Sequence, residues 1–295
     1  MTVEQYLLKK YKKSSLTPNL CSIRKYLNFI QNKAETAQYK DILDYVGHLR
    51  KNENLQPKTI RQYLNGAKIY YHYLLEIGKR NDHPCSELYL KDKINKQIKV
   101  DILYSAETLE KYLESHKNDP KLVRRRNEVI IGLLIYQGLT VGEICTLQIE
   151  DINLEKAEIT IKTNEKPTRI LPLQAKQILL FLNYLKEDKP KLIQHLQSEK
   201  PIKTLITGKF EEKVRPNVIN KMINEHLPKN QQLQPIKIRQ SVIANLLKKE
   251  NDTRIVQVFA GHKRASTTIL YKQTELEILQ NAINLYHPIQ LKISS

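Results

Sequence analysis

Apolar side chains recur every three to four residues along most of the chain, a spacing typical of amphipathic helices. In the first part of the chain this pattern predicts helices at 1–13, 18–32, about 38–52 and 59–75. Pro57 and Thr59 suit the start of the last of these helices, and Gly78 suits its end. We therefore expect the first hundred residues to form a bundle of short helices.

One stretch of the second part has a different pattern. Between 159 and 173, two isoleucines precede a polar turn and a second apolar run follows it, which predicts a β-hairpin. Around the hairpin the patterns are helical: Ser105 suits a helix start, 127–138 predicts a buried helix, and helices follow at 174–198 and from 216 onward. The predicted fold class is mainly α with a small β-sheet.

A polar, lysine-rich segment at 90–100 separates the two parts. A chain of 295 residues is long enough for two domains. We predict an N-terminal helical domain at 1–93, a linker at 94–100, and a mixed α/β, mostly α, second domain at 101–295.

The charge of the chain points to a polyanionic partner. Lys and Arg number 49 against 31 Asp and Glu, a formal net charge of +18. The first hundred residues alone hold 19 basic and 9 acidic residues. A compact helical domain with this excess suits the phosphate backbone of DNA, with an anionic membrane surface as the second candidate.

Other features narrow the class of protein. No run of apolar residues is long enough to span a membrane, and the first residues lack the apolar core of a signal peptide. The three cysteines are far apart and form no Cys-x-x-Cys pair, so we expect reduced thiols and a cytoplasmic location. The eight histidines are scattered, so no metal site is expected.

The C-terminal part holds groups that suit attack on a DNA phosphodiester. Such a reaction needs a hydroxyl nucleophile, cationic donors for the phosphate oxygens, and a proton for the departing 5′-oxygen. Arg239 lies near the start of a predicted helix, His262 follows a glycine, and Tyr271 comes nine residues after His262. Arginine binds phosphate through its planar fork, and Lys or His can supply a proton.

This order of Arg239, Gly261-His262, Ser266-Thr267-Thr268 and Tyr271 resembles the C-terminal signature of the tyrosine recombinases, the family of phage-type integrases and Xer-like enzymes. Three more stretches resemble the same family in the same order. They are QPKTIRQYLNGAKIYYHYLLEIG (56–78) with the following His83-Pro84, YQGLTVGEICTLQIEDI (136–152) and the hairpin IKTNEKPTRILPL (161–173).

The resemblance implies an N-terminal core-binding domain and a C-terminal catalytic domain that clamp double-stranded DNA at specific recombination sites. It implies site-specific recombination, including integration of mobile elements, by a tetramer that needs no cofactor. Tyr271 would form a 3′-phosphotyrosyl link, Arg239 and His262 would stabilise the transition state, and Lys162 would protonate the leaving group. Lys166 is the alternative hairpin lysine. The segment 274–290 would dock on a neighbouring protomer.

Two positions depart from the family pattern. The first catalytic arginine of the family should stand at Thr140, and the position three before Arg239, usually His, is Ile236. Arg126, in the triplet 124–126, and Lys237 are the candidates to compensate for the missing charge. Glu143 is expected to have a structural role, by capping or by ion pairing.

The remaining candidates are DNA contacts and alternative functions. Lys58 and Arg61 in the first domain, with Lys263 and Arg264 in the second, are the predicted nucleic-acid contacts. The two departures favour, as an alternative, a degenerate recombinase that binds DNA without cutting it. An unrelated all-α DNA-binding regulator would leave the spacing of Gly261-His262 and Tyr271 unexplained.

Overall fold

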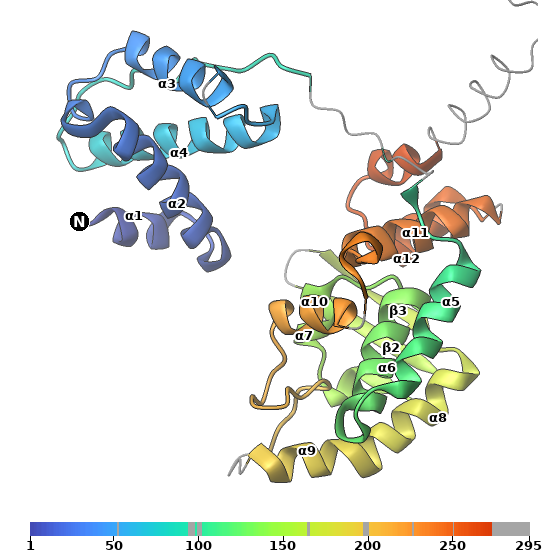
Figure 1. Ribbon diagram of the computed structural model, residues 1–295. Coiled ribbons are helices and arrows are strands. Elements are labelled where there is room, and N and C mark those ends of the chain that lie inside the picture. Colours follow the sequence, from blue (N-terminus) through green and yellow to red (C-terminus); the bar gives the residue numbers. More distant parts are fainter. Residues whose placement is uncertain are drawn as a thin grey trace, which may run out of the picture. The chain divides into compact units, whose positions relative to one another are not determined.

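The computed structural model describes residues 1–51, 53–93, 98, 102–163, 166–196, 201–225, 227–249 and 251–272. The chain divides into two compact units, Met1–Lys96 and Gln97–Ser295, which Figure 1 traces in chain order. Of the predicted linker at 94–100, only Ile98 lies among the described residues. The predicted docking segment at 274–290 lies outside them entirely.

The N-terminal unit is helical, as the apolar pattern predicts. Its helices are α1 (Val3–Lys10), α2 (Lys13–Ile30), α3 (Tyr39–Lys51) and α4 (Pro57–Glu76), with a 3-10 turn at Gln31–Lys33. The predicted boundary between the first two helices is wrong. The chain turns out of α1 at Tyr11 and Lys12, which are extended, and Pro18 lies inside α2. No glycine or proline marks this break, so the helical period alone could not locate it.

Helices α2 and α4 pack directly on each other. A Cβ atom on Gly66 would lie 2.5 Å from Cβ of Ser22, so only glycine permits this close approach. Tyr26, Tyr45 and Tyr71 are fully buried in the core between the helices, and the hydroxyls of Tyr26 and Tyr71 are hydrogen-bonded to each other.

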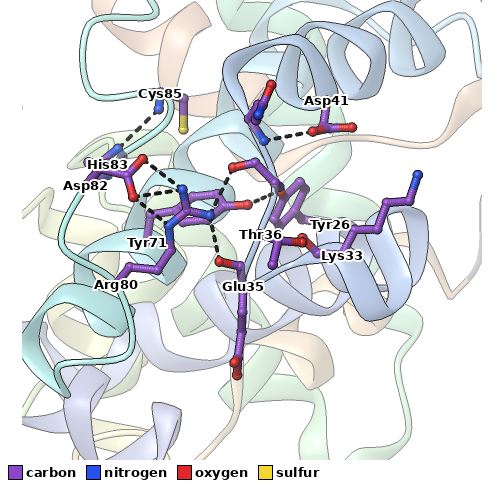
Figure 2. A network of polar contacts seen from close by, with 12 residues as sticks. Tyr26, Lys33, Glu35, Thr36, Asp41, Tyr71, Arg80, Asp82, His83 and Cys85 are labelled. Atoms are coloured by element: carbon purple, nitrogen blue, oxygen red, sulfur yellow. Dashed lines mark hydrogen bonds and ion pairs between the residues drawn. The ribbon is translucent and has the colours of Figure 1, made fainter.

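A polar network closes one side of this core (Figure 2). Nη1 of Arg80 donates to the backbone carbonyls of Glu35 and Ala37, both at 2.9 Å, while Nε and Nη2 donate to the carboxylate of Asp82. The guanidinium also lies 5.3 Å from the ring centroid of Tyr71. All three nitrogens of Arg80 therefore have a partner within the unit.

The C-terminal unit combines helices with one small sheet. Its helices are α5 (Ala106–Ser115), α6 (Lys121–Tyr136), α7 (Val141–Thr146), α8 (Ala175–Asn183), α9 (Lys189–Leu196), α10 (Pro216–Asn224), α11 (Pro235–Lys248) and α12 (Thr253–Ala260). Short turns at His116–Asn118, Ile149–Asp151, Tyr184–Asp188 and Lys229–Gln231 join some of them, and residues 265–272 are helical. Ser105 caps α5 as expected.

The predicted hairpin is present and gains one short strand. Strands β1 (Ile152–Asn153), β2 (Glu158–Thr163) and β3 (Lys166–Pro172) form an antiparallel sheet in that order. In the register of β2 and β3, Ile161 lies opposite Arg169 and Ile159 lies opposite Leu171. Paired residues share a face of a sheet, so Arg169 lies on the same face as the buried isoleucines.

The core of this unit surrounds α6, which is buried along most of its length and packs against α5, α8 and α11. A second, smaller cluster joins α11 and α12 to Tyr271. Helix α12 also contacts β3. These packings bring the hairpin and the C-terminal helices together. Among the described residues, no helix has both the length and the apolarity that a membrane span requires.

Candidate active site

Arg239 lies in the second turn of α11 and is only 5% exposed. Its guanidinium donates two hydrogen bonds, from Nη1 to the carbonyl of Gly138 and from Nη2 to the carbonyl of Ala260. Gly138 follows α6 and Ala260 ends α12, so Arg239 binds carbonyls at the C-terminal ends of two helices. Burial lowers the pKa of Arg239, and the carboxylate of Glu143 opposes this effect.

Thr140, at the place of the expected arginine, caps α7. Its hydroxyl accepts a hydrogen bond from the backbone N–H of Glu143, and its own N–H and hydroxyl both donate to Oε2 of Glu143 at 2.9 Å. This reciprocal pair is a capping box. The structural role expected for Glu143 is confirmed, because the cap fixes its carboxylate in the buried interior.

Glu143 also pairs with an arginine that the sequence patterns did not single out. Nη1 of Arg169, on β3, lies 2.9 Å from Oε1 of Glu143, and the exposed fractions of the two side chains are 2% and 4%. A sequence signal did exist. Positions 169, 171 and 173 alternate inward along the strand, and the first of these is charged. A charge at an inward position marks a special environment.

The turn after α12 brings the next residues beside this ion pair. Gly261 ends the helix in the left-handed conformation, with φ of +62°. A Cβ atom there would lie 2.7 Å from Nη1 and 3.0 Å from Cζ of Arg169. Glycine is thus required both by the backbone and by the guanidinium beneath it.

His262 and Tyr271 lie together after this turn. Nδ1 of His262 is 2.9 Å from the hydroxyl of Thr268, and its ring is nearly parallel to that of Tyr271, with 6.2 Å between centroids. Tyr271 is 6% exposed. Burial raises the pKa of Tyr271, while the positive charge of Arg239 acts to lower it. The structure therefore brings Arg239, His262 and Tyr271 into one cluster with Glu143 and Arg169.

Lys162, the predicted hairpin lysine, lies outside this cluster of buried groups. Lys162 is on β2, adjacent to Ile161, so it points to the opposite face of the sheet. Its side chain is 57% exposed, and Nζ lies 2.8 Å from Oδ1 of Asp151. The interaction with the Asp151 carboxylate raises the pKa of Lys162. The side chain of the alternative, Lys166, lies outside what the structure describes.

The structure does not bring Arg126 to this site. It lies in the second turn of α6, ten residues before Tyr136, which places it about 15 Å along the helix from the end near Arg239. Its guanidinium is buried and donates to Oδ1 of Asn127. The compensation once expected from Arg126 therefore has no geometric support. Lys237 and the exposed Ile236 lie in the first turn of α11.

The predicted DNA contacts have different surroundings. Lys58, Lys263 and Arg264 are exposed, and Lys58 lies in the first turn of α4. Arg61 is instead engaged inside its unit, where Nη2 donates to the carbonyls of Leu90 and Asp92. Arg61 thus holds the chain segment after α4.

Neither a metal site nor a disulfide is seen in the part of the chain that the structure describes. No group of three or more His, Cys, Asp or Glu residues there is placed to hold a metal ion. The three cysteines are free thiols; Cys21 is exposed, and Cys85 and Cys145 are buried.

Comparison with known families agrees with this geometry. The model described as Phage integrase family matches residues 104–277, and the model described as Phage integrase, N-terminal SAM-like domain, matches residues 2–78. The first match covers more than half of the chain and includes Arg169, Arg239, His262 and Tyr271.

Individual relatives cover nearly the whole chain. The TnP I resolvase of Bacillus thuringiensis is 26% identical over 274 residues, covering 89% of this chain and 90% of that protein. Tyrosine recombinase XerD of Listeria innocua serovar 6a is 26% identical over 255 residues, covering 86% and 84%. The solved structure of XerH recombinase on a palindromic difH substrate has a TM-score of 0.66 at 20% identity, covering 92% of this chain and 80% of that one, and so shares the fold. The chain belongs to the phage integrase family and is a tyrosine recombinase, an enzyme that breaks and rejoins DNA strands in site-specific recombination.

Proposed function

We propose that this chain exchanges strands between specific double-stranded DNA sites with Tyr271 as its nucleophile. One observation carries the assignment: Tyr271, His262 and Arg239 lie in a single cluster built from the ends of α6 and α12. The positive charge of Arg239 acts to lower the pKa of Tyr271. The departures at Thr140 and Ile236 are the only basis for the alternative of a protein that binds DNA without cutting it, and the comparisons add nothing in its favour.

In the proposed reaction the Tyr271 oxygen bonds to phosphorus as the bond from phosphorus to the 5′-oxygen breaks. Tyr271 loses its proton and the departing 5′-oxygen gains one, while the phosphodiester is kept as a phosphotyrosine. Arg239 and His262 donate to the phosphate oxygens, whose negative charge grows in the transition state. Because the new link conserves the energy of the old one, religation needs no nucleotide.

The leaving-group proton is assigned to Lys162. Its pairing with Asp151 favours the ammonium form, so it holds a proton to give. Its place on the exposed face of β2 means that DNA must come to it, or the hairpin must move. Lys166, the first residue of β3, is the alternative donor.

The partners follow from the charge and from the relatives. A net charge of +18 suits the DNA backbone, and the XerH and λ integrase structures with a similar fold are complexes with DNA. Exposed Lys58, Lys263 and Arg264 are proposed backbone contacts. We further propose a cytoplasmic enzyme that works as a homotetramer on two sites, with integration or resolution of a mobile element as the biological task.

The test is covalent capture of DNA. The full chain is incubated with duplexes of randomised core sequence that carry a nick, so that the cleaved fragment diffuses away and the adduct is trapped. We expect a denaturation-resistant adduct that Tyr271→Phe abolishes and that Tyr39→Phe, a change of an exposed tyrosine in the other unit, leaves intact. If no duplex yields an adduct that depends on Tyr271, the proposed function is rejected and a non-cleaving DNA-binding protein takes its place.

A further inference from the structure

The position of Arg169 is unusual for a charged residue. It lies on β3 opposite Ile161, at an inward position where its neighbours are apolar, and its side chain is 2% exposed. Isolated charges in such surroundings are strongly disfavoured unless they are fully paired.

The pairing of Arg169 is incomplete. Nη1 is bound to Glu143, but within the described residues neither Nε nor Nη2 has a hydrogen-bond partner, although both are buried. An unpaired buried donor costs about 1–3 kcal/mol, and more when it is charged. Among the described residues, Arg61 and Arg126 each also have one unpaired buried nitrogen, whereas Arg169 has two, and in a native protein such donors have room for a water molecule, an ion or a ligand.

The surroundings of Arg169 indicate which ligand is missing. Its guanidinium lies directly under Gly261, one residue before His262, and its charge contributes to lowering the pKa of Arg239. Two guanidinium groups therefore face one carboxylate, that of Glu143, which leaves one positive charge in excess in a buried site. An anion completes this arrangement, and the anion that this site handles is the DNA phosphate.

The same cluster supplies a guanidinium, that of Arg169, although position 140 holds a threonine. The Thr140 hydroxyl donates a hydrogen bond to Oε2 of Glu143, and Oε1 of the same carboxylate accepts one from Arg169. The guanidinium then comes from a neighbouring strand, beside Arg239, instead of from the start of α7.

We infer that Arg169 is the second phosphate-binding arginine of the active site and donates from Nε and Nη2 to a non-bridging oxygen of the scissile phosphate. The inference rests on the proposed function. Nε and Nη2 of Arg169 are buried beneath the Gly261–His262 turn. The inference therefore also requires this turn to move when DNA binds.

The experiment compares two substrates on two enzymes. Single-turnover cleavage is measured for the wild-type chain and Arg169→Gln, on the nicked duplex captured by the wild type and on the same duplex with a neutral methylphosphonate at the scissile position. On the charged substrate we expect Arg169→Gln to be about 100- to 1000-fold slower, the usual effect of removing one transition-state donor. On the neutral substrate we expect the deficit to shrink to less than about tenfold, because less charge develops there.

Controls separate a catalytic contact from a structural one. Arg215→Gln removes an exposed arginine that is ion-paired to Glu211, and it should cleave both substrates as the wild type does. If Arg169→Gln does not fold, judged by thermal unfolding and non-covalent DNA binding, Arg169→Met combined with Glu143→Gln removes both charges together and takes its place.

The outcomes are distinct. An equal deficit on both substrates, or no deficit on either, overturns the inference while the wild-type adduct still stands for the proposed function. A wild-type chain that forms no Tyr271-dependent adduct rejects the proposed function itself, whatever Arg169 does.

Discussion

One arginine of each unit, Arg80 and Arg169, has a largely buried side chain beside a short turn, and the two differ in how their nitrogens are paired. In the N-terminal unit, Arg80 uses Nε, Nη1 and Nη2 to bind two backbone carbonyls and the carboxylate of Asp82 (Figure 2). In the C-terminal unit, Arg169 is more deeply buried but has a described partner only on Nη1.

This contrast separates two uses of the same side chain. Arg80 joins the segment after α2 to the segment after α4, and its donors are satisfied by the protein alone, which is how a guanidinium stabilises a fold. Arg169 pairs with one carboxylate, and its Nε and Nη2 have no partner among the described residues, which suits a group that binds an external anion. Burial alone would not tell the two apart, whereas the state of each nitrogen does.

The largest expected effect on stability comes from Arg80. Replacing Arg80 by Met leaves the buried Ala37 carbonyl without its partner and removes the bridge to Glu35 and Asp82, so we expect a loss of about 2–3 kcal/mol in the N-terminal unit. Hydrogen–deuterium exchange of α4 amides in the full chain measures this loss within one unit.

The matched variant in the other unit should behave differently. Arg169→Met combined with Glu143→Gln removes a whole buried ion pair, which is often neutral, so the stability of the C-terminal unit should change by less than about 1 kcal/mol. A loss as large as that of Arg80→Met would mean that Arg169 is a structural group of the same kind, and the contrast would fail.

An effect smaller than that of Arg80→Met is expected at Thr140, which binds the carboxylate of Glu143 that pairs with Arg169. Thr140→Ala removes the cap of α7 and one of the donors to Glu143, so we expect a loss of about 1 kcal/mol. This loss of stability is measured by urea unfolding of the full chain, with hydrogen–deuterium exchange of the α7 amides as the signal. Thr140→Ser keeps the hydroxyl and should match the wild type; if serine and alanine behaved alike, the cap would contribute nothing.

Local sequence patterns located most of the fold. The helical period placed α3, α4 and α6, and the run from Ile159 to Leu173 placed the hairpin, because each of these signals depends on neighbours within a few residues. The sequence patterns did not predict the break at Tyr11 and Lys12 or the two-residue strand β1. Neither is marked by a helix-breaking residue or by a periodic pattern of its own.

The active site was harder to predict from the sequence than the fold, for a physical reason. Tyr271, His262 and Arg239 follow a short-range signature, but Arg169 is defined by Glu143 before it and Gly261 far after it. Packing of β3 against α12 brings Gly261 to Arg169, and Glu143 reaches it from α7. The charge of Arg126 suggested compensation for Thr140. Its burial in the second turn of α6 and its hydrogen bonds to Asn127 could not be predicted from charge alone.

The last prediction concerns the buried tyrosines, and its effect is absent at neutral pH. Burial is the main cause that raises the pKa of Tyr26 and Tyr71 in the N-terminal unit, the latter to about 12, and it also raises that of Tyr271 in the other unit. An unfolded tyrosine ionises near pH 10, so between about pH 10 and 12 the unfolded chain releases protons that the folded chain retains. Stability is therefore complete below pH 10 and falls as the pH rises above it.

Urea unfolding at pH 8, 9, 10 and 11 tests this sign. We expect a constant free energy of unfolding up to about pH 9 and a decline at pH 11, part of which Tyr71→Phe removes and Tyr39→Phe, at an exposed site, does not. In the same range attack by Tyr271 should become faster as the pH rises, because the pH approaches the raised pKa of its hydroxyl and a growing fraction is ionised. A stability that declined already below pH 9, or that stayed level at pH 11, would show that these hydroxyls are not held protonated by the fold.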